Sequence, residues 1–254
     1  MRIKKNFIKM KIPNNNTCSK CSNEVDTKMN FCANCGFQLS NNSLVSEKFI
    51  TKSIVFYICF IGFLIVYYLI QPEIPSLLNE LILESSFIIF ILIFCLLDFK
   101  NILPLILFPK LSIPIYIFTF IFPVFSAIVV FYAINWLNNL LGFENANLFI
   151  RYASFENASL WAFIFVAFIP AIFEELAFRG YLFNQLSQVL TPQTTILVSS
   201  FLFALMHLSV FSLLWILPFG IVLGYLRNKY NTLWLGIIIH FIHNSIMLYV
   251  DIQS

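Results

Sequence analysis

The sequence has little charge and little glycine for its length of 254 residues. Charged residues make up 11% of it and glycine occurs seven times, whereas a soluble domain has about 25% charged residues. Apolar residues make up 60%, including 31 phenylalanines, and the mean hydropathy is +0.87. One core of this size cannot hide so much apolar surface from water. The composition therefore excludes a soluble globule and indicates that the lipid bilayer is the main partner.

Positive charge is concentrated near the start of the chain. The net charge is +3, and nine of the fifteen Lys and Arg residues precede residue 53. This distribution indicates the basic cytoplasmic end of a membrane protein and no nucleic-acid partner. The first long apolar run begins at Ile54, behind this basic stretch, so we expect no secretory signal peptide and a cytoplasmic N-terminus.

Apolar segments follow one another from Ile54 onward, and a membrane-spanning helix needs about 20 such residues. Seven candidates are present, at 54–70, 84–97, 112–134, 160–183, 194–208, 213–226 and 233–250. Three are short, and a half-helix at 102–108 would bring the number to eight. The sequence predicts an all-α polytopic membrane protein, divided into a basic tail (1–16), a small zinc ribbon (17–39), a linker (40–52) and a transmembrane helical domain (53–251).

The loops between these segments give an independent test of the topology. With the N-terminus inside, the inner loops carry Lys100, Lys110, Arg227 and Lys229, and the outer loops carry Arg151 as their basic residue. Cytoplasmic loops of membrane proteins are enriched in Lys and Arg. The distribution supports seven spans in a multi-pass protein of the cell membrane.

Four cysteines, Cys18, Cys21, Cys32 and Cys35, form a C-x2-C-x10-C-x2-C pattern. Two such pairs of thiolates can close a tetrahedral Zn²⁺ site. The segment resembles small zinc-ribbon modules at the ends of many bacterial and archaeal proteins. With four thiolates and no open coordination position, the zinc would be structural and would supply the folding energy of so short a module. Disulfides are the other interpretation, which a reducing cytoplasm disfavours. The ribbon could also bind a protein partner.

Ionisable residues lie inside the predicted spans, where each charge costs about 2.5–3.5 kcal/mol and therefore indicates function. Glu175 and Arg179 are four residues apart and can pair on one helix face. Glu174 lies about 100° around that helix, without the cation, and is predicted to accept a proton. His240 and Asn244 are also four residues apart and can point into one cavity.

Three motifs follow one another on the later predicted helices: EELAFR from Glu174, F-x3-H ending at His207, and H-x3-N from His240 to Asn244. This set resembles the CPBP family of intramembrane proteases, which includes the CAAX prenyl endopeptidases and bacteriocin-processing or self-immunity proteins. The resemblance covers about residues 155–250. It implies an intramembrane endopeptidase that acts on a hydrophobic or membrane-bound peptide substrate.

The resemblance also implies a role for each matched residue. Glu174 would activate a water molecule, Glu175 and Arg179 would form a supporting pair, and His207 would share the water. His240 and Asn244 would stabilise the oxyanion or help to hold a metal.

Two further residues accompany these motifs. Phe203 would form a wall of the cavity. His243 has no family counterpart and is expected to pack against the site or to support it.

The residues leave the need for a metal open. Glu174, His207 and His240 could hold a catalytic Zn²⁺ with an open coordination position. A metal-free mechanism based on glutamate and water would use the same atoms, with donors for the developing oxyanion.

Binding without catalysis and transport are the two other functional classes. The chain could keep the fold and act by binding, as a non-catalytic bacteriocin self-immunity or membrane partner-binding protein. A transporter would show inverted repeats with broken helices at matching positions in two halves, and the sequence shows no such symmetry.

Overall fold

The computed structural model describes residues 17–18, 20–25, 32, 34–36, 43–72, 75–143, 147–209 and 211–254, and only the backbone of residues 43–46. These residues belong to two units, Met1–Ser46 and Glu47–Ser254. The basic tail predicted at 1–16 lies outside the described residues. The larger unit contains the predicted catalytic residues.

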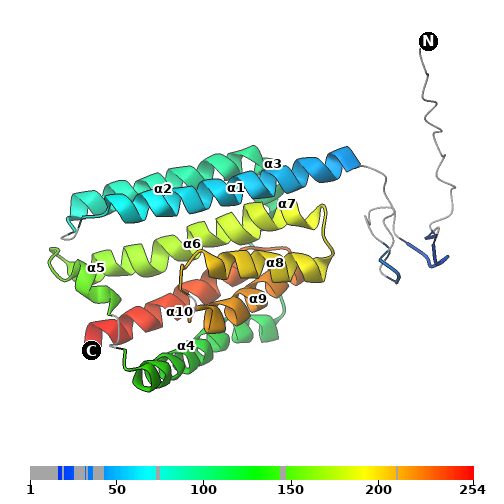
Figure 1. The fold of residues 1–254 in the computed structure, drawn as a ribbon. Helices are drawn as coiled ribbons and strands as arrows, with labels where there is room; N and C mark the ends of the chain where they lie inside the picture. Colours follow the sequence, from blue (N-terminus) through cyan, green and yellow to red (C-terminus); the bar gives the residue numbers. More distant parts are fainter. Residues whose placement is uncertain are drawn as a thin grey trace, which may run out of the picture. The chain divides into compact units, whose positions relative to one another are not determined.

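Each of the seven predicted apolar segments corresponds to a helix (Figure 1). The helices are α1 (Ser43–Ile70), α2 (Leu77–Leu97), α4 (Ile113–Leu141), a composite helix over 158–187, α8 (Pro192–Leu205), α9 (Leu213–Tyr230) and α10 (Trp234–Gln253). The composite helix consists of α5 (Ala158–Ala162), the π-helical η3 (Phe163–Phe168), α6 (Ile169–Glu175), the π-helical η4 (Leu176–Leu182) and α7 (Phe183–Ser187).

Five of these helices are long and apolar enough to cross a membrane: Glu47–Ile70, Leu77–Leu97, Ile113–Leu141, Ala158–Ser187 and Trp234–Gln253. Helix α8 has 14 residues, which at 1.5 Å per residue gives about 21 Å. This is less than the hydrocarbon thickness of about 30 Å. The all-α membrane fold is therefore confirmed, and α8 is too short to be a full span on its own.

The composite helix lies in the middle of the larger unit (Figure 1). Helices α1 and α2 lie together on one side of it, and α8, α9 and α10 lie on the other, with α4 beyond α10. Helix α2 contacts η4, whereas α10 contacts η3, α6 and α4. The composite helix is therefore packed between α2 and α10, and α10 is the helix that packs against α6.

Phenylalanine fills the space between α1, α2 and η4. Phe56 and Phe60 of α1 are fully buried. The ring centroids of Phe56 and Phe94 lie 5.0 Å apart at 80°, and those of Phe60 and Phe178 lie 5.4 Å apart at 70°. Such edge-to-face pairs contribute about 0.5–1.5 kcal/mol each beyond the burial of their area. This aromatic cluster fixes the composite helix against α1 and α2.

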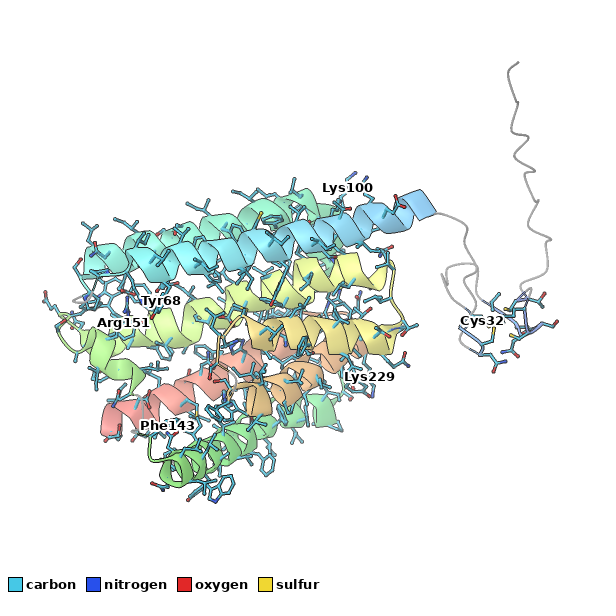
Figure 2. The ribbon with its side chains drawn as sticks, in the orientation of Figure 1. Cys32, Tyr68, Lys100, Phe143, Arg151 and Lys229 are labelled. Atoms are coloured by element: carbon cyan, nitrogen blue, oxygen red, sulfur yellow. The ribbon has the colours of Figure 1, made fainter. Side chains whose placement is uncertain are left out.

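Apolar side chains also cover the outside of the helices (Figure 2). Tyr68 is 68% exposed and Phe143 is 56% exposed. Soluble monomers rarely expose contiguous apolar patches of large size, so these surfaces fit contact with lipid chains. Cys95 is buried, whereas Cys59 is exposed because Phe56 and Phe60 occupy the buried face of α1.

The basic residues of the loops separate between the two ends of the bundle. Lys100 and Lys229 lie at one end, and Arg151 lies at the opposite end (Figure 2). The two lysines that were predicted for inner loops therefore lie on one side, away from the arginine that was predicted for an outer loop.

Short helical turns close both ends of α10. Helix α3 (Phe99–Ile102) and the 3-10 turn η1 (Leu103–Ile106) occupy most of the segment that was predicted as a half-helix. The N–H of Leu233 donates to the carbonyl of Leu105 at 3.0 Å. At the other end, Leu148 of the 3-10 turn η2 (Leu148–Tyr152) donates its N–H to Asp251 Oδ2 at 3.0 Å.

Helices α8 and α9 pack closely through small residues. A Cβ atom on Gly220 would lie 3.2 Å from Ser200 Cβ, and one on Gly224 would lie 3.3 Å from Ile196 Cγ2. Small residues four apart allow helix backbones to approach closely in membrane proteins. This packing places Gly220 of α9 beside Arg179.

Candidate active site

A cavity of about 360 Å³ lies next to the predicted catalytic residues. Its polar lining consists of Glu174, His207, His240, His243 and Asn244. The rest of its wall is largely apolar and comes from α4, η2, η3, α6, α8, α9 and α10. The fold therefore brings the three sequence motifs to one cavity.

The carboxylates of this site lie at the end of α6, between the π-helical turns η3 and η4. Turns of this kind are rare and occur frequently at functional sites. Pro170 in α6 has no N–H to donate to the carbonyl of Val166, four residues earlier. That carbonyl accepts a hydrogen bond from Asn244 Nδ2 of α10 at 3.0 Å. The proline thus leaves a main-chain acceptor for the asparagine.

Glu175 and Arg179 form the ion pair that their spacing predicts. Arg179 Nη1 donates to Glu175 Oε1 at 2.9 Å, and the two side chains are 1% and 0% exposed. Arg179 Nη2 also donates to the carbonyl of Gly220 at 3.2 Å, and the guanidinium lies 4.2 Å from the ring centroid of Phe203. Removing either partner would leave a buried charge, which is costly, so the pair is mutually dependent.

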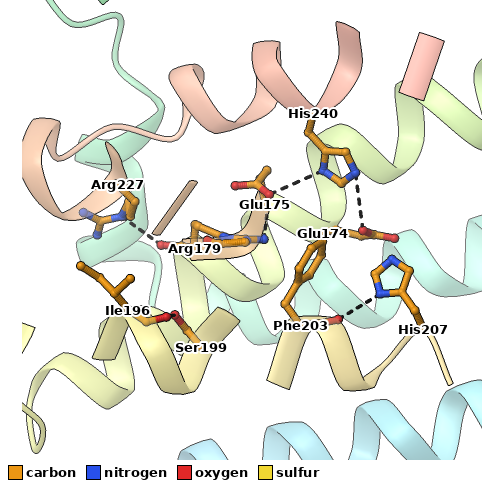
Figure 3. Close-up of polar contacts among 10 residues, drawn as sticks. Glu174, Glu175, Arg179, Ile196, Ser199, Phe203, His207, Arg227 and His240 are labelled. Atoms are coloured by element: carbon orange, nitrogen blue, oxygen red, sulfur yellow. Dashed lines mark hydrogen bonds and ion pairs between the residues drawn. The ribbon is translucent and has the colours of Figure 1, made fainter. Parts of the chain in front are cut away.

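His240 lies between the two glutamates (Figure 3). Its Nε2 is 3.9 Å from Glu174 Oε2, and its Nδ1 is 3.6 Å from Glu175 Oε1. Both distances are longer than a hydrogen bond. Glu174 Oε2 is buried and has no hydrogen-bond partner among the described residues. A buried oxygen of this kind can accept a hydrogen bond from a substrate group or a water molecule.

His207 lies on the other side of the Glu174 carboxylate (Figure 3). Its Nδ1 is 3.0 Å from the carbonyl oxygen of Phe203. Because a carbonyl only accepts, Nδ1 carries the hydrogen, and Nε2 of the neutral ring is an acceptor. The ring of Phe203 meets the His207 ring nearly edge-on, with centroids 5.1 Å apart. Phe203 therefore orients the histidine as well as lining the cavity.

Comparison with known families assigns this arrangement to a class. The family model described as type II CAAX prenyl endopeptidase Rce1-like matches residues 156–246, a range that includes all three motifs. The chain carries a CPBP family protease domain. No curated protein and no solved structure matches the chain. The CPBP domain and the apolar helices together indicate a multi-pass membrane protein.

His243 of the CPBP domain lines the cavity directly. Its ring centroid lies 4.8 Å from that of Phe219. Its Nδ1 is buried, with no hydrogen-bond partner in the described part of the chain. The residue therefore faces the space that a substrate would enter.

Gly236 of the CPBP domain was not identified from the sequence. A Cβ atom at this position would overlap Glu175 Oε2. Helix α10 thus approaches α6 so closely that glycine is required. The signal in the sequence is a glycine within an apolar helix, one turn before His240, because such a glycine often marks close packing.

The smaller unit brings the four predicted zinc ligands together. Their Sγ atoms all lie within 4.8 Å of one another, with Cys18 and Cys35 at 3.6 Å and Cys21 and Cys32 at 3.5 Å. A tetrahedral site with Zn–S bonds of about 2.3 Å has S···S edges of about 3.8 Å, so the donor set fits zinc. A hydrogen bond from the backbone of Asn23, and then one with Cys35, lowers the pKa of the Cys21 thiol to about 6. This favours the thiolate, the form that binds metal.

Glu174, His207 and His240 do not form a comparable group. Within the described residues, the four cysteines form the only group of at least three potential metal ligands whose atoms all lie this close to one another. No catalytic step is therefore assigned to a metal.

Proposed function

We propose that the CPBP domain hydrolyses a peptide bond of a membrane-associated protein or hydrophobic peptide with a water molecule activated by Glu174. The observation that carries this proposal is the buried, unpartnered Glu174 oxygen at the cavity wall, with His207 and His240 on either side. A general base must lie within hydrogen-bond reach of the proton that it removes. A water molecule in this cavity would meet that condition.

In the proposed reaction, Glu174 takes a proton from the water while the water oxygen attacks the carbonyl carbon. Nε2 of His207 accepts the second hydrogen bond of the same water and orients it. The carbonyl π electrons move to oxygen and form the tetrahedral intermediate. When the C–N bond breaks, Glu174 returns its proton to the leaving nitrogen. The cycle consumes one water molecule and leaves the protein unchanged.

His240 and Asn244 are proposed to stabilise the oxyanion. The Asn244 side-chain amide has two N–H groups, and one donates to the carbonyl of Val166, which leaves the other for the substrate. A hydrogen on Nε2 of His240 would be a second donor. The loss of one such donor typically costs about 10²–10³ in kcat.

Glu175 and Arg179 are proposed to hold His240 in place and to take no proton themselves. Glu175 Oε1 accepts from Arg179 and faces Nδ1 of His240 at 3.6 Å. Arg179 holds this carboxylate in place, and the carboxylate in turn faces the imidazole ring whose Nε2 lies toward Glu174.

The apolar wall of the cavity suggests the substrate class. Val130 and Ile134 of α4, Trp215 of α9 and Met247 of α10 all line the space. Such a wall favours an apolar side chain beside the scissile bond and gives no site for a charged one. We further propose that the protein resides in the cell membrane with a cytoplasmic N-terminus, where the ribbon would hold structural zinc and could contact a protein partner.

Proteolysis by the purified full-length protein in lipid vesicles tests the proposal, with a panel of apolar membrane peptides as substrates. Glu174→Gln and His207→Ala should each reduce the cleavage rate at least 10²-fold. Glu156→Gln is the matched control, because Glu156 is exposed on the same domain, and it should cleave at the wild-type rate. Cleavage by Glu174→Gln at the wild-type rate would refute the role of this residue.

Two additional arms separate the other interpretations. A chelator that stops cleavage in both the wild type and Cys32→Ser would point to a catalytic metal, whereas a chelator that stops cleavage only in the wild type would act through the ribbon. If wild-type protein cleaves none of the peptides, and a bacteriocin protection assay is unaffected by Glu174→Gln, the protein acts by binding.

A further inference from the structure

Arg227 in the last turn of α9 is buried, with an exposed fraction of 7%. Its Nε donates to the carbonyl of Arg179 at 2.9 Å, its Nη1 to Asn231 Oδ1 at 2.9 Å, and its Nη2 to Asn184 Oδ1 at 2.8 Å. The guanidinium also lies 5.3 Å from the ring centroid of Phe183. All three acceptors are neutral oxygens. Burial of a cation requires that its donors be satisfied, and these bonds satisfy each nitrogen in turn.

The carbonyl of Arg179 is available because the helix is irregular at this point. In a regular α-helix it would accept the N–H of Phe183. In η4 this N–H is directed to the carbonyls of Phe178 and Gly180 instead. The guanidinium of Arg227 therefore takes the place of a main-chain donor within the π-helical turn that follows the catalytic glutamates.

Helix α9 holds Arg179 at two points. The carbonyl of Gly220 accepts from the Arg179 guanidinium, and Arg227 donates to the Arg179 main chain. The two α9 residues are seven positions apart, which is about 10.5 Å along a helix. Two anchors at this separation fix both the position of the Arg179 backbone and the direction of its side chain.

A counter-charge reaches Arg227 through one intervening amide. Asn184 accepts from Arg227 through Oδ1 and donates from Nδ2 to Asp98 Oδ2 at 3.2 Å. Asp98 is 8% exposed and also accepts from Asn101 at 2.6 Å. Polar chains of this kind polarise each other and hold one geometry.

We infer that Arg227 is a positioning residue for the catalytic centre. It locks the Arg179 main chain in η4, and Arg179 in turn holds Glu175, whose carboxylate faces His240. The inference rests on the proposed function where it is tested by kcat. Hydrogen exchange tests it without catalysis. Neither Arg227 nor Asn184 contacts the cavity lining through a polar atom among the described contacts.

The test compares Arg227→Met, Arg227→Lys and the control Lys229→Met in the full chain, in vesicles, with one cleavable peptide. Lys229 is a cation on the same turn, but it is exposed and donates to Tyr225. Substitution of a residue that orients a catalytic group typically costs 10–100-fold. We expect kcat per folded molecule to fall about 10–100-fold in Arg227→Met, with KM within about twofold of wild type. The kcat of Arg227→Lys, which keeps a cationic donor, should lie between those of wild type and Arg227→Met. The kcat of Lys229→Met should match that of wild type.

A merely structural anchor would behave differently, because fewer molecules would fold while each folded molecule kept its kcat. An unchanged kcat per folded molecule in Arg227→Met therefore overturns the inference. If Arg227→Met does not fold, Asn184→Ala decides, since it removes one of the three anchors. A roughly threefold or larger fall in kcat at constant KM supports the inference, and an unchanged kcat overturns it.

Hydrogen exchange separates failure of this inference from failure of the proposed function. Amides of residues 175–182 should exchange at least tenfold faster in Arg227→Met than in wild type, and at the wild-type rate in Lys229→Met. If the wild type cleaves no peptide, the proposed function fails, and exchange alone decides the positioning role. Unchanged exchange at 175–182 then overturns it.

Discussion

Replacing Gly236 with alanine tests whether the approach of α10 to α6 sets the catalytic geometry. The added Cβ would overlap Glu175 Oε2 and would lie 3.2 Å from Glu175 Cδ. The Glu175 side chain is fully buried, with Arg179 at 2.9 Å and His240 Nδ1 at 3.6 Å. It has no free space to enter. Either the carboxylate leaves its partners, or α10 moves and takes His240 with it.

The size of the effect follows from the contact distances. Non-bonded atoms are at their optimum near 3.5–4.0 Å, so relief of the overlap requires a shift on the order of 1 Å. A misplacement of about 1 Å in a catalytic site can cost about 10²-fold in rate. Overpacking of a dense interior costs about 1–3 kcal/mol of stability. Gly236→Ala should therefore lose about 10²-fold in kcat and about 1–3 kcal/mol of unfolding free energy.

Gly62→Ala is the matched control for this experiment. Gly62 also lies within a helix, but a Cβ there would meet no atom within 4 Å. Alanine should be neutral or stabilising at this position by up to about 1 kcal/mol, because it has the higher helix propensity. Thermal unfolding and peptide cleavage in detergent measure both quantities.

The double variant Gly236→Ala with Glu175→Asp tests the cause of the loss. The shorter aspartate would withdraw from the added methyl group, so part of the stability should return relative to Gly236→Ala alone. Non-additivity of this kind identifies residues in contact. If Gly236→Ala instead retained the kcat and unfolding temperature of Gly62→Ala, the proposed dependence of catalysis on this helix spacing would be wrong.

Three further predictions concern other parts of the molecule. Arg151→Met should lower the free energy of unfolding by about 3 kcal/mol, because it leaves the fully buried Glu80 without the cation that lies 2.6 Å away. The double variant Arg151→Met with Glu80→Gln should recover most of this loss in thermal unfolding, and an equally unstable double variant would contradict the reasoning. Cys32→Ser should lower the zinc content of the purified protein from one ion per chain, as measured by metal analysis, because three thiolates no longer close the site; undiminished zinc would place the metal elsewhere. Pro170→Ala should reduce cleavage while leaving the unfolding temperature unchanged or higher, because the new N–H competes with Asn244 for the Val166 carbonyl. Undiminished cleavage would show that Asn244 does not depend on Pro170 for its position.

The features that the sequence predicts correctly depend on one helix at a time. Long apolar runs locate each of the seven long helices, and the four-residue spacing of Glu175 and Arg179 predicts their ion pair. The predicted start of a helix is wrong where the helix contains a charge that is paired with a residue distant in the sequence. Helix α2 begins at Leu77, whereas the predicted span began at residue 84, because the charge of Glu80 is paired with Arg151.

Contacts between helices explain what the sequence does not predict. The charge of Arg227 predicts a position in an inner loop. The side chain is instead buried, because oxygens of η4, of α7 and of the residue that follows α9 accept its hydrogen bonds. The π-helical turns, the requirement for Gly236 and the bond from Asn244 to Val166 likewise depend on how α6, α9 and α10 lie against one another. Such relations carry no periodic signal along the chain.

The partners of the buried charges give an argument for the catalytic residue that is independent of the sequence motifs. Glu175 has Arg179, and Asp98 is joined to Arg227 through the amide of Asn184. A low-dielectric interior makes each of these pairings strongly favourable, so the arginines are committed to other acids. Glu174, beside the same residues, faces imidazole rings and a cavity instead of a guanidinium. Of the two neighbouring glutamates, the one that the fold leaves without an arginine is therefore the proposed proton acceptor.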